Sequence, residues 1–318
     1  MTELPGTKRF FLTLTYLFSC VLLSNENAFS QGQTFDRHVS LTVENDALLL
    51  LGIDRYYTNG FEFTYRKLKQ SPDSIRPNML FRYSLSQKIY TTASKIWEKV
   101  KYFDRPYAGW LFAEAETNWV YQKNIFSLGI RASMTGPWAK GEEMQNGLHR
   151  LLGFNEARGW EYQIHNSLGI DITGAWESEI SGSRNFRITA KCRGSAGSTI
   201  TQFAGGPVLE FGRLRPFKQS TLRTHGLGPR TGTPEIVFYI NPEAVWQIHD
   251  STIVGPPFDS ESPQTAKLEP FYGTLSSGIA YTRGHLATKF YYVLYSPNIK
   301  NMFFDWHGYG GITLAVVW

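Results

Sequence analysis

Apolar and polar residues alternate along most of this chain, which is the pattern of β-strands with one face in an apolar environment. Twelve segments fit this pattern, and most have the ~9–11 residues that a tilted strand needs to cross a bilayer. They are residues 37–46, 57–68, 79–89, 109–121, 123–135, 161–177, 185–195, 200–212, 234–248, 268–282, 285–296 and 307–318. The fold class predicted is all-β, a twelve-stranded antiparallel transmembrane β-barrel.

The last ten residues support a barrel in particular. Their large apolar side chains fall on one face, which carries Ile312, Leu314, Val316 and Trp318. An apolar outer face that ends in an aromatic residue is typical of the final strand of bacterial outer-membrane barrels. The edge strand of a soluble sheet is the alternative, and the aromatic content of 15% favours the barrel.

The start of the chain indicates export. Lys8 and Arg9 precede a mostly apolar run over residues 10–23, and small residues follow up to Ser30. This layout predicts a signal peptide over residues 1–30 and an outer-membrane β-barrel over 31–318. Cleavage would leave Cys192 as the one cysteine, so no intramolecular disulfide is expected. The net charge of +5 then points to phosphorylated lipid rather than nucleic acid as the anionic partner.

The connections between strands orient the barrel. With both termini in the periplasm, five long segments fall outside the cell: 47–56, 90–108, 136–160, 249–267 and 297–306. Gln122–Asn124 and Arg283–Gly284 become tight periplasmic turns, which is the asymmetry expected of such barrels. Residues 213–233 do not fit, because they form a long connection on the periplasmic side.

One external segment, residues 136–153, has a helical pattern instead. Met144, Leu148 and Leu151 recur at helical spacing, while Gln145 and His149, four residues apart, share an adjacent face. A short helix that offers an imidazole beside a barrel is a candidate catalytic element. The alternative is that His149 only packs in the helix or faces solvent.

Oxygen-bearing side chains gather where the first two strands meet outside the membrane. Asn45 and Asp46 end the first strand, and Asp54 and Thr58 lie at the start of the second. Oxygen donors suit a hard cation, so Ca²⁺ is the predicted cofactor, with Asp46 as its main ligand and Asp54 as a helper. Asn-Asp after a strand is also a common turn signal, so taken alone the pair could be structural.

Taken together, these motifs resemble those of the outer-membrane lipid A 3′-O-deacylases, the LpxR-type barrels. The resemblance spans the first half of the mature chain, in order and at compatible spacing. It rests on Glu44-Asn45-Asp46, Asp54-Arg55-Tyr56-Tyr57-Thr58-Asn59-Gly60-Phe61, Gln87 with Tyr90-Thr91, Asp104-Arg105-Pro106-Tyr107-Ala108-Gly109-Trp110-Leu111, and Gly136-Pro137 followed by Gly141, Gln145, His149, Gly153, Trp160 and Gln163.

The resemblance implies a site between the barrel wall and the external helix, facing the outer leaflet, with His149 as general base. Neutral imidazole can take a proton from the attacking water at physiological pH. Ca²⁺ held by Asp46 would stabilise the oxyanion. Asn45 or Thr58 would position the water or donate to the oxyanion, and Gln145 would fix the imidazole or contact substrate.

Three departures from the family pattern bear on this site. Ala47 stands where some members have a second Asp, and Glu156 is not placed as their acidic residue after the helix. The family's loop lysine could be Lys95, Lys99 or Lys101. These departures leave the ligand set and the role of Glu156 open.

The predicted function is hydrolysis of ester-linked acyl chains, at the 3′-O position by resemblance, from lipid A of lipopolysaccharide. Candidate external residues for its phosphates are Lys101, Arg105, Lys140, Arg150 and Arg158. A monomer in the bacterial outer membrane is expected, with no nucleic-acid partner. The alternatives are a Ca²⁺-dependent outer-membrane phospholipase and a non-enzymatic structural or pore barrel.

Overall fold

The computed structural model describes residues 34–49, 55–72, 76–94, 97, 99–230, 232–257 and 261–318. The predicted signal peptide (1–30), Asp54 and Lys95 lie outside the described residues. No helix within these ranges is long and apolar enough to cross a membrane.

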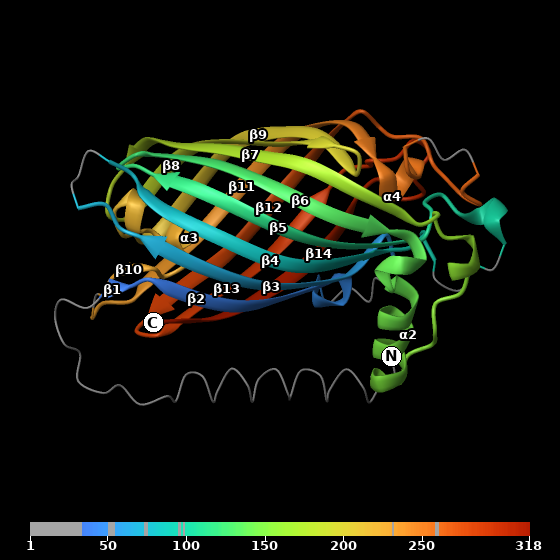
Figure 1. Ribbon diagram of the computed structural model, residues 1–318, viewed down its shortest axis with the longest axis horizontal. Coiled ribbons are helices and arrows are strands. Elements are labelled where there is room, and N and C mark those ends of the chain that lie inside the picture. The colour runs from blue at the N-terminus through green and yellow to red at the C-terminus, as the bar shows by residue number, and fades with distance from the viewer. Residues whose placement is uncertain are drawn as a thin grey trace.

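Twelve antiparallel strands form a closed barrel (Figure 1), as the sequence predicts. Each strand pairs with its neighbours along the chain, and β14 pairs with β2 to close the wall. The strands are β2 (Arg37–Asn45), β3 (Tyr57–Lys69), β4 (Asn78–Tyr90), β5 (Ala108–Val120), β6 (Asn124–Thr135), β7 (Ser167–Gly182), β8 (Phe186–Gly197), β9 (Ile200–Arg213), β11 (Glu235–Asp250), β12 (Phe271–Arg283), β13 (Leu286–Tyr295) and β14 (His307–Val317).

The wall has an apolar outer face and a polar inner face. On β7, Leu168, Ile170 and Ile172 are more than half exposed, whereas Asp171 between them is fully buried in the barrel. Because side chains alternate across a strand, this pattern gives lipid an apolar surface and keeps the charged groups inside. Short turns join the strands at one end, between β5 and β6 and between β12 and β13, so that end is periplasmic.

The largest difference from the predicted boundaries is in the sixth strand. Residues 161–177 were expected to form it, but β7 runs over Ser167–Gly182. Trp160–Tyr162 instead form a 3-10 turn, η4, which follows Gly159 with a φ of 101°. Trp160 is buried edge-on against Tyr107, 5.1 Å between ring centroids, so its aromatic side chain packs under a loop rather than facing lipid.

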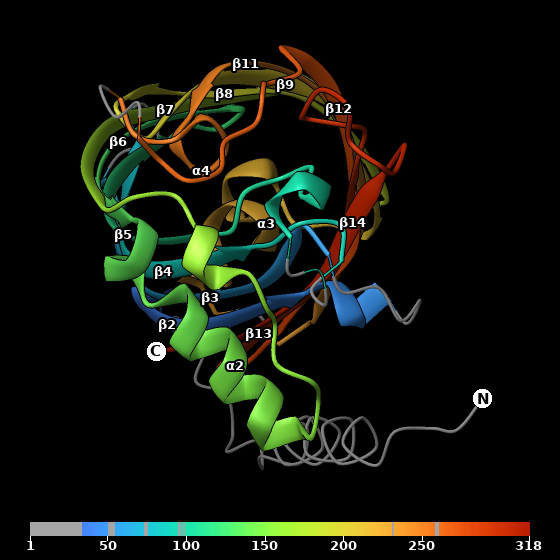
Figure 2. The same ribbon diagram turned by 90° about the vertical axis from the view of Figure 1, so that its right-hand side faces the viewer.

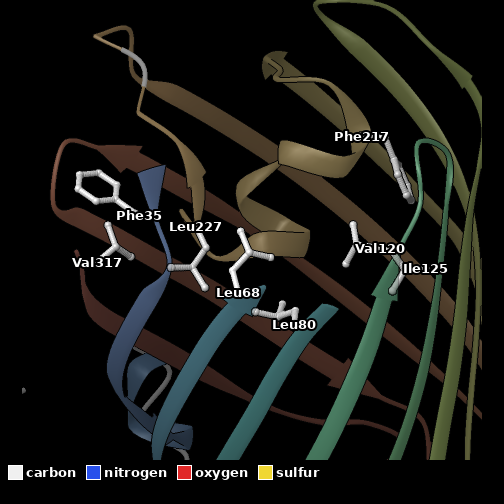
Figure 3. Close-up of a cluster of buried hydrophobic side chains, with 8 residues drawn as sticks. All are labelled: Phe35, Leu68, Leu80, Val120, Ile125, Phe217, Leu227 and Val317. Atoms are coloured by element: carbon white, nitrogen blue, oxygen red, sulfur yellow. The ribbon is translucent and has the colours of Figure 1, made fainter. Parts of the chain in front are cut away.

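The long periplasmic connection folds back into the barrel. We call its residues 214–230 the plug; it contains η5 (Phe217–Gln219), α3 (Thr221–Thr224) and β10 (Gly228–Pro229), which pairs with β1 (Thr34–Phe35). Figure 2 shows α3 within the ring of strands. Side chains from the plug and the wall form a buried apolar cluster (Figure 3): Phe35, Leu68, Leu80, Val120, Ile125, Phe217, Leu227 and Val317.

Ion pairs hold the plug as well. Arg223 of α3 is buried between two strands, where it pairs with Glu210 and lies 3.5 Å from Glu177. Buried charges of this kind are stable only when paired, so the plug and the inner wall are complementary. The connection that the strand pattern left unexplained therefore closes the periplasmic end of the barrel.

Candidate active site

The candidate catalytic helix lies outside the barrel wall. After β6, the chain forms η3 (Gly136–Ala139) and then α2 (Gly141–Leu152), which sits beyond the ring of strands in Figure 2. Gln87 of β4 fastens this segment, since its Nε2 donates to the Ala139 carbonyl oxygen over 2.6 Å. Gln87 of the family pattern therefore joins the wall to the start of the helix.

Two glycines let the helix approach the wall closely. A Cβ on Gly141 would lie 2.9 Å from Cα of Gly109 on β5 and 2.8 Å from the Trp160 ring. Contacts this short are not tolerated, so the close approach of the two backbones requires glycine, which has no side chain. Gly147, in the middle of α2, has nothing within 4 Å of such a Cβ and carries no comparable constraint.

The chain after α2 returns along the helix and fixes the imidazole. Gly153 ends the helix in the left-handed region with a φ of 76°. Asn146 then accepts from the Ala157 amide over 2.8 Å and donates to the Ala157 carbonyl. This return places the Asn155 carbonyl oxygen 2.7 Å from Nδ1 of His149, which is 4% exposed. Because a carbonyl only accepts, Nδ1 carries a hydrogen, and in the neutral imidazole the lone pair is then on Nε2.

Thr58 reaches the helix because β3 begins irregularly. Tyr56 has a φ of 61°, and the pairing of β3 with β4 shifts register between Tyr57 and Asn59, so that Thr58 is an extra residue. His307 of β14 supports this start by accepting from the Tyr57 amide over 3.1 Å. The bulge leaves Thr58 fully buried beneath α2.

A chain of hydrogen bonds joins five of the candidate and family residues. Gln145 Nε2 donates to Thr58 Oγ1 over 3.5 Å, and Trp160 Nε1 donates to Gln145 Oε1 over 3.0 Å. On the other side Asn59 Nδ2 donates to Thr58 Oγ1 over 3.4 Å, while Asn45 Nδ2 donates to Asn59 Oδ1. The structure therefore brings together Asn45, Thr58 and Gln145 across the wall and the helix.

Asp46 occupies a separate, buried position. It begins η1 (Asp46–Leu49), is 2% exposed, and accepts from the Arg55 amide over 2.7 Å, which closes the loop between β2 and β3. The carboxylate of Asp46 and the side-chain oxygens of Asn45 and Thr58 are donors of the kind that a hard cation such as Ca²⁺ prefers. Among the described residues no group of three His, Cys, Asp or Glu side chains could hold a metal, and Asp54 is not among them.

Two of the family departures acquire definite positions. Glu156 is half exposed and pairs with Arg150 over 2.6 Å. The Ala47 amide donates to Asn45 Oδ1 over 2.7 Å in a local turn. The hydrogen-bond partner of His149 Nδ1 is the carbonyl of Asn155, the residue before Glu156.

Sequence reasoning missed three residues that shape this region. Asn59 and Trp160 belong to the family motifs, but their roles as the links on either side of Thr58 and Gln145 depend on the bulge and on η4. Asp104 joins three loops: it accepts from Tyr56 Oη over 2.6 Å, Thr92 Oγ1 over 2.8 Å and the Phe303 amide over 3.0 Å. Burial, together with Asp104, raises the pKa of Tyr56.

The candidate phosphate-binding residues do not share one surface. Lys140 pairs with Glu143 over 2.8 Å, which lowers the pKa of Glu143, and Arg150 pairs with Glu156. Arg105 was expected outside, but it is 2% exposed and donates to Oγ1 of Thr252 over 2.9 Å. Its guanidinium lies over the Tyr90 ring, so it belongs to the barrel interior.

The fold and the site together define a class: a twelve-stranded outer-membrane barrel, plugged at the periplasmic end, with a polar site between its outer wall and an external helix. The comparisons are specific about the family. The model of the family described as "Outer membrane protein LpxR" matches residues 13–318. The chain belongs to the LpxR family of outer membrane proteins.

Solved structures agree on the fold. The chain is similar to LpxR from Salmonella typhimurium, with a TM-score of 0.74 and 18% sequence identity over 88% of this chain and 100% of that one. It is also similar to the β domain of the Bordetella autotransporter BrkA, with a TM-score of 0.50 and 7% identity over 90% of this chain and 100% of that one. A search of curated proteins finds no match.

Proposed function

We propose that this protein hydrolyses ester-linked acyl chains of lipid A in the outer leaflet of the outer membrane. The observation that carries the proposal is the hydrogen bond from His149 Nδ1 to the Asn155 carbonyl. It leaves a basic Nε2 on a helix that rests against the lipid-facing wall at the extracellular end of the barrel. The 3′-O position is proposed on family resemblance alone.

His149 acts as general base in the proposed reaction. The oxygen of a water attacks the acyl carbonyl carbon while Nε2 of His149 accepts the water's proton. When the tetrahedral intermediate collapses, the C–O bond to the sugar breaks, and the imidazolium returns the proton to the sugar oxygen. The products are a free fatty acid and a sugar hydroxyl, so no other reactant is required.

The remaining site residues orient this chemistry. Thr58 and Gln145 lie between the wall and the helix, where they position the water or donate to the developing oxyanion. Asp46, with oxygens of Asn45 and Thr58, would hold a hard cation such as Ca²⁺, with Asp54 as a further ligand. When bound, such an ion supplies a Lewis acid for the carbonyl oxygen.

The site also bears on the two alternatives. A phospholipase would use the same base and the same depth in the leaflet, so only products separate it from a lipid A deacylase. A pore is disfavoured by the plug, where Phe217 and Leu227 are almost fully buried inside the periplasmic end.

Mass spectrometry of lipid A and phospholipids from a Gram-negative host that expresses the protein tests the proposal. Loss of an ester-linked fatty acid from lipid A, with phospholipids unchanged, is the expected result. Accumulation of lysophospholipid with intact lipid A would show a phospholipase instead. Unchanged lipids, with folded protein in the outer membrane, would contradict both.

A further inference from the structure

The barrel contains a second polar site, inside the lumen. A cavity of about 390 Å³ lies above the plug, within the size range of small-molecule pockets. Its lining comes from strands all round the barrel and includes five cationic side chains, Lys88, Arg105, Arg131, Lys191 and Arg193, but only two carboxylates, Glu243 and Asp250. Lys88, Arg131 and Arg193 are paired with glutamates, as Arg187 and Arg223 of the plug region are, and this leaves Arg105 and Lys191.

Both carboxylates of the lining are already engaged. Glu243 accepts two bonds from Arg193, at 3.2 Å from Nε and 3.1 Å from Nη2. Asp250 caps the short helix α4 (Ser251–Val254), since its Oδ1 accepts from the amide and the hydroxyl of Thr252. Neither carboxylate, however, forms a salt bridge with Lys191 or Arg105 among the described residues, and Asp250 reaches Arg105 only through the hydroxyl of Thr252.

Two cations of the lining lack a carboxylate within 4 Å. Lys191 stands directly across from Glu177 in the β7–β8 ladder, but Glu177 is paired with Arg223 of the plug. Arg105 is 2% exposed and bonds only to Thr252, through the hydroxyl and, at 3.4 Å, the carbonyl. Cations without a directly contacting carboxylate in a shielded cavity favour the binding of an anion from solution.

The indole N–H of Trp110 is a third donor in the cavity that needs an acceptor. Trp110 lines the cavity and is 4% exposed, yet its indole N–H has no hydrogen-bond partner. An indole nitrogen can only donate, as can a guanidinium and an ammonium. The cavity thus contains donors that lack acceptors, on Arg105, Lys191 and Trp110. The oxygen atoms of an oxyanion would supply those acceptors.

We propose that this luminal cavity binds a small, soluble oxyanion that also carries hydroxyl groups, such as a phosphorylated monosaccharide. The anionic group accepts from Arg105, Lys191 and Trp110. Aromatic rings and hydroxyls for the sugar come from five tyrosines of the lining: Tyr57, Tyr90, Tyr272, Tyr295 and Tyr309. The wall is a closed ring of strands, so a lipid whose acyl chains remain in the bilayer cannot supply the ligand.

The luminal site is distinct from the proposed active site, although the two share a strand. Tyr57 lines the cavity, whereas Thr58, displaced by the bulge, contacts Gln145 of the external helix. The inference therefore goes beyond the proposed hydrolysis and does not depend on it. The plug separates the cavity from the periplasm, which leaves the extracellular side as the route for a solute.

Isothermal titration of the refolded full-length protein in detergent tests this proposal, with glucose 6-phosphate, inorganic phosphate and glucose as probes. The expected order of affinity is glucose 6-phosphate above phosphate, with no measurable binding of glucose. Lys191→Gln is expected to weaken glucose 6-phosphate binding about tenfold or more, because a charge-assisted hydrogen bond is lost. Lys69→Gln, an exposed lysine at the periplasmic end of β3, is the matched control and leaves the affinity unchanged.

Two further measurements keep the test decisive. Trp110→Phe retains the ring but removes the donor, so it weakens binding even if the Lys191 variant fails to fold. His149→Gln retains full binding, which separates this site from the hydrolase. Absence of binding by phosphate and glucose 6-phosphate, equal loss in the Lys69 control, or competition by lipid A micelles would each overturn the proposal.

Discussion

Nδ1 of His149 lies 2.7 Å from the carbonyl oxygen of Asn155, so its partner is a backbone group. A carbonyl fixes the tautomer and the orientation of the ring as a carboxylate does, but it adds no full negative charge. The imidazole is therefore oriented by the return of the chain after α2, and that return is held by Asn146.

Glu156→Gln is expected to retain hydrolysis near the wild-type level. Glu156 is half exposed and paired with Arg150, and such a surface pair contributes little. The rate of fatty-acid release from purified lipid A, measured for both proteins, checks this. A loss of a hundredfold or more would instead assign Glu156 a direct role beside the imidazole.

Thr58→Val is expected to lower the hydrolysis rate by about tenfold or more while the barrel still folds. Valine keeps the shape but leaves the amide groups of Gln145 and Asn59 without their shared acceptor, a cost of about 1–3 kcal/mol in a buried site. Thr58→Ser, which keeps the hydroxyl, is the control and retains most activity. Equal activity of the two variants would show that the Thr58 hydroxyl has no role in hydrolysis.

Gly141→Ala is expected to reduce activity strongly without changing the thermal stability of the barrel. The added methyl group would meet the Trp160 ring at 2.8 Å and push α2 away from the wall. Gly147→Ala is the matched control, because that position is open and alanine favours the helix by about 1 kcal/mol. The prediction fails if both variants hydrolyse lipid A at the same rate.

Removal of divalent cations with a chelator is expected to stop hydrolysis, and Ca²⁺ is expected to restore it. Asp46→Asn keeps an oxygen for the Arg55 amide but loses the carboxylate charge, so it raises the Ca²⁺ concentration needed for half-maximal activity. A calcium titration of both proteins measures the shift. Full activity in the chelator would exclude a metal requirement.

The plug is expected to lose stability as the pH falls below about 6.5. Burial, and then the nearby charge of Arg66, lower the pKa of His225 well below its usual value. Below pH ~6.5 the unfolded chain therefore binds a proton on His225 that the folded chain does not. This group thus makes the free energy of unfolding decrease as the pH is lowered below ~6.5, and it has no effect on that free energy at higher pH. Unfolding in guanidinium at pH 7.5 and pH 5 should show this loss, and His225→Gln should reduce it. An identical loss in that variant would contradict the assignment.

The sequence predicts the wall of this protein well, because the alternation of side chains directly reflects which face meets lipid. The number of strands, the tight turns and the helix near His149 all follow from local patterns. The plug could not be predicted in this way, because its packing depends on pairs such as Arg223 and Glu210. No periodic pattern in the chain indicates that these two residues meet. Similarly, Glu161 and Tyr162 were predicted to begin a strand, but they belong to the 3-10 turn η4.

The candidate site could likewise be predicted only in part. The spacing of Gln145 and His149 predicts a shared helix face, and the pairing of the first two strands predicts that Asn45 and Thr58 lie near each other. The bulge at Thr58, the link through Asn59 and the carbonyl of Asn155 depend on backbone geometry that no side-chain pattern records. Those features decide how the site residues are oriented.

The most direct test of the account is the lipid A mass spectrum of a host expressing His149→Gln beside one expressing His285→Gln. His285 is an exposed histidine in the turn between β12 and β13, at the opposite end of the barrel. The account predicts deacylated lipid A with the His285 variant and intact lipid A with the His149 variant, both folded in the outer membrane. Deacylation by the His149 variant at the wild-type level would contradict the central claim.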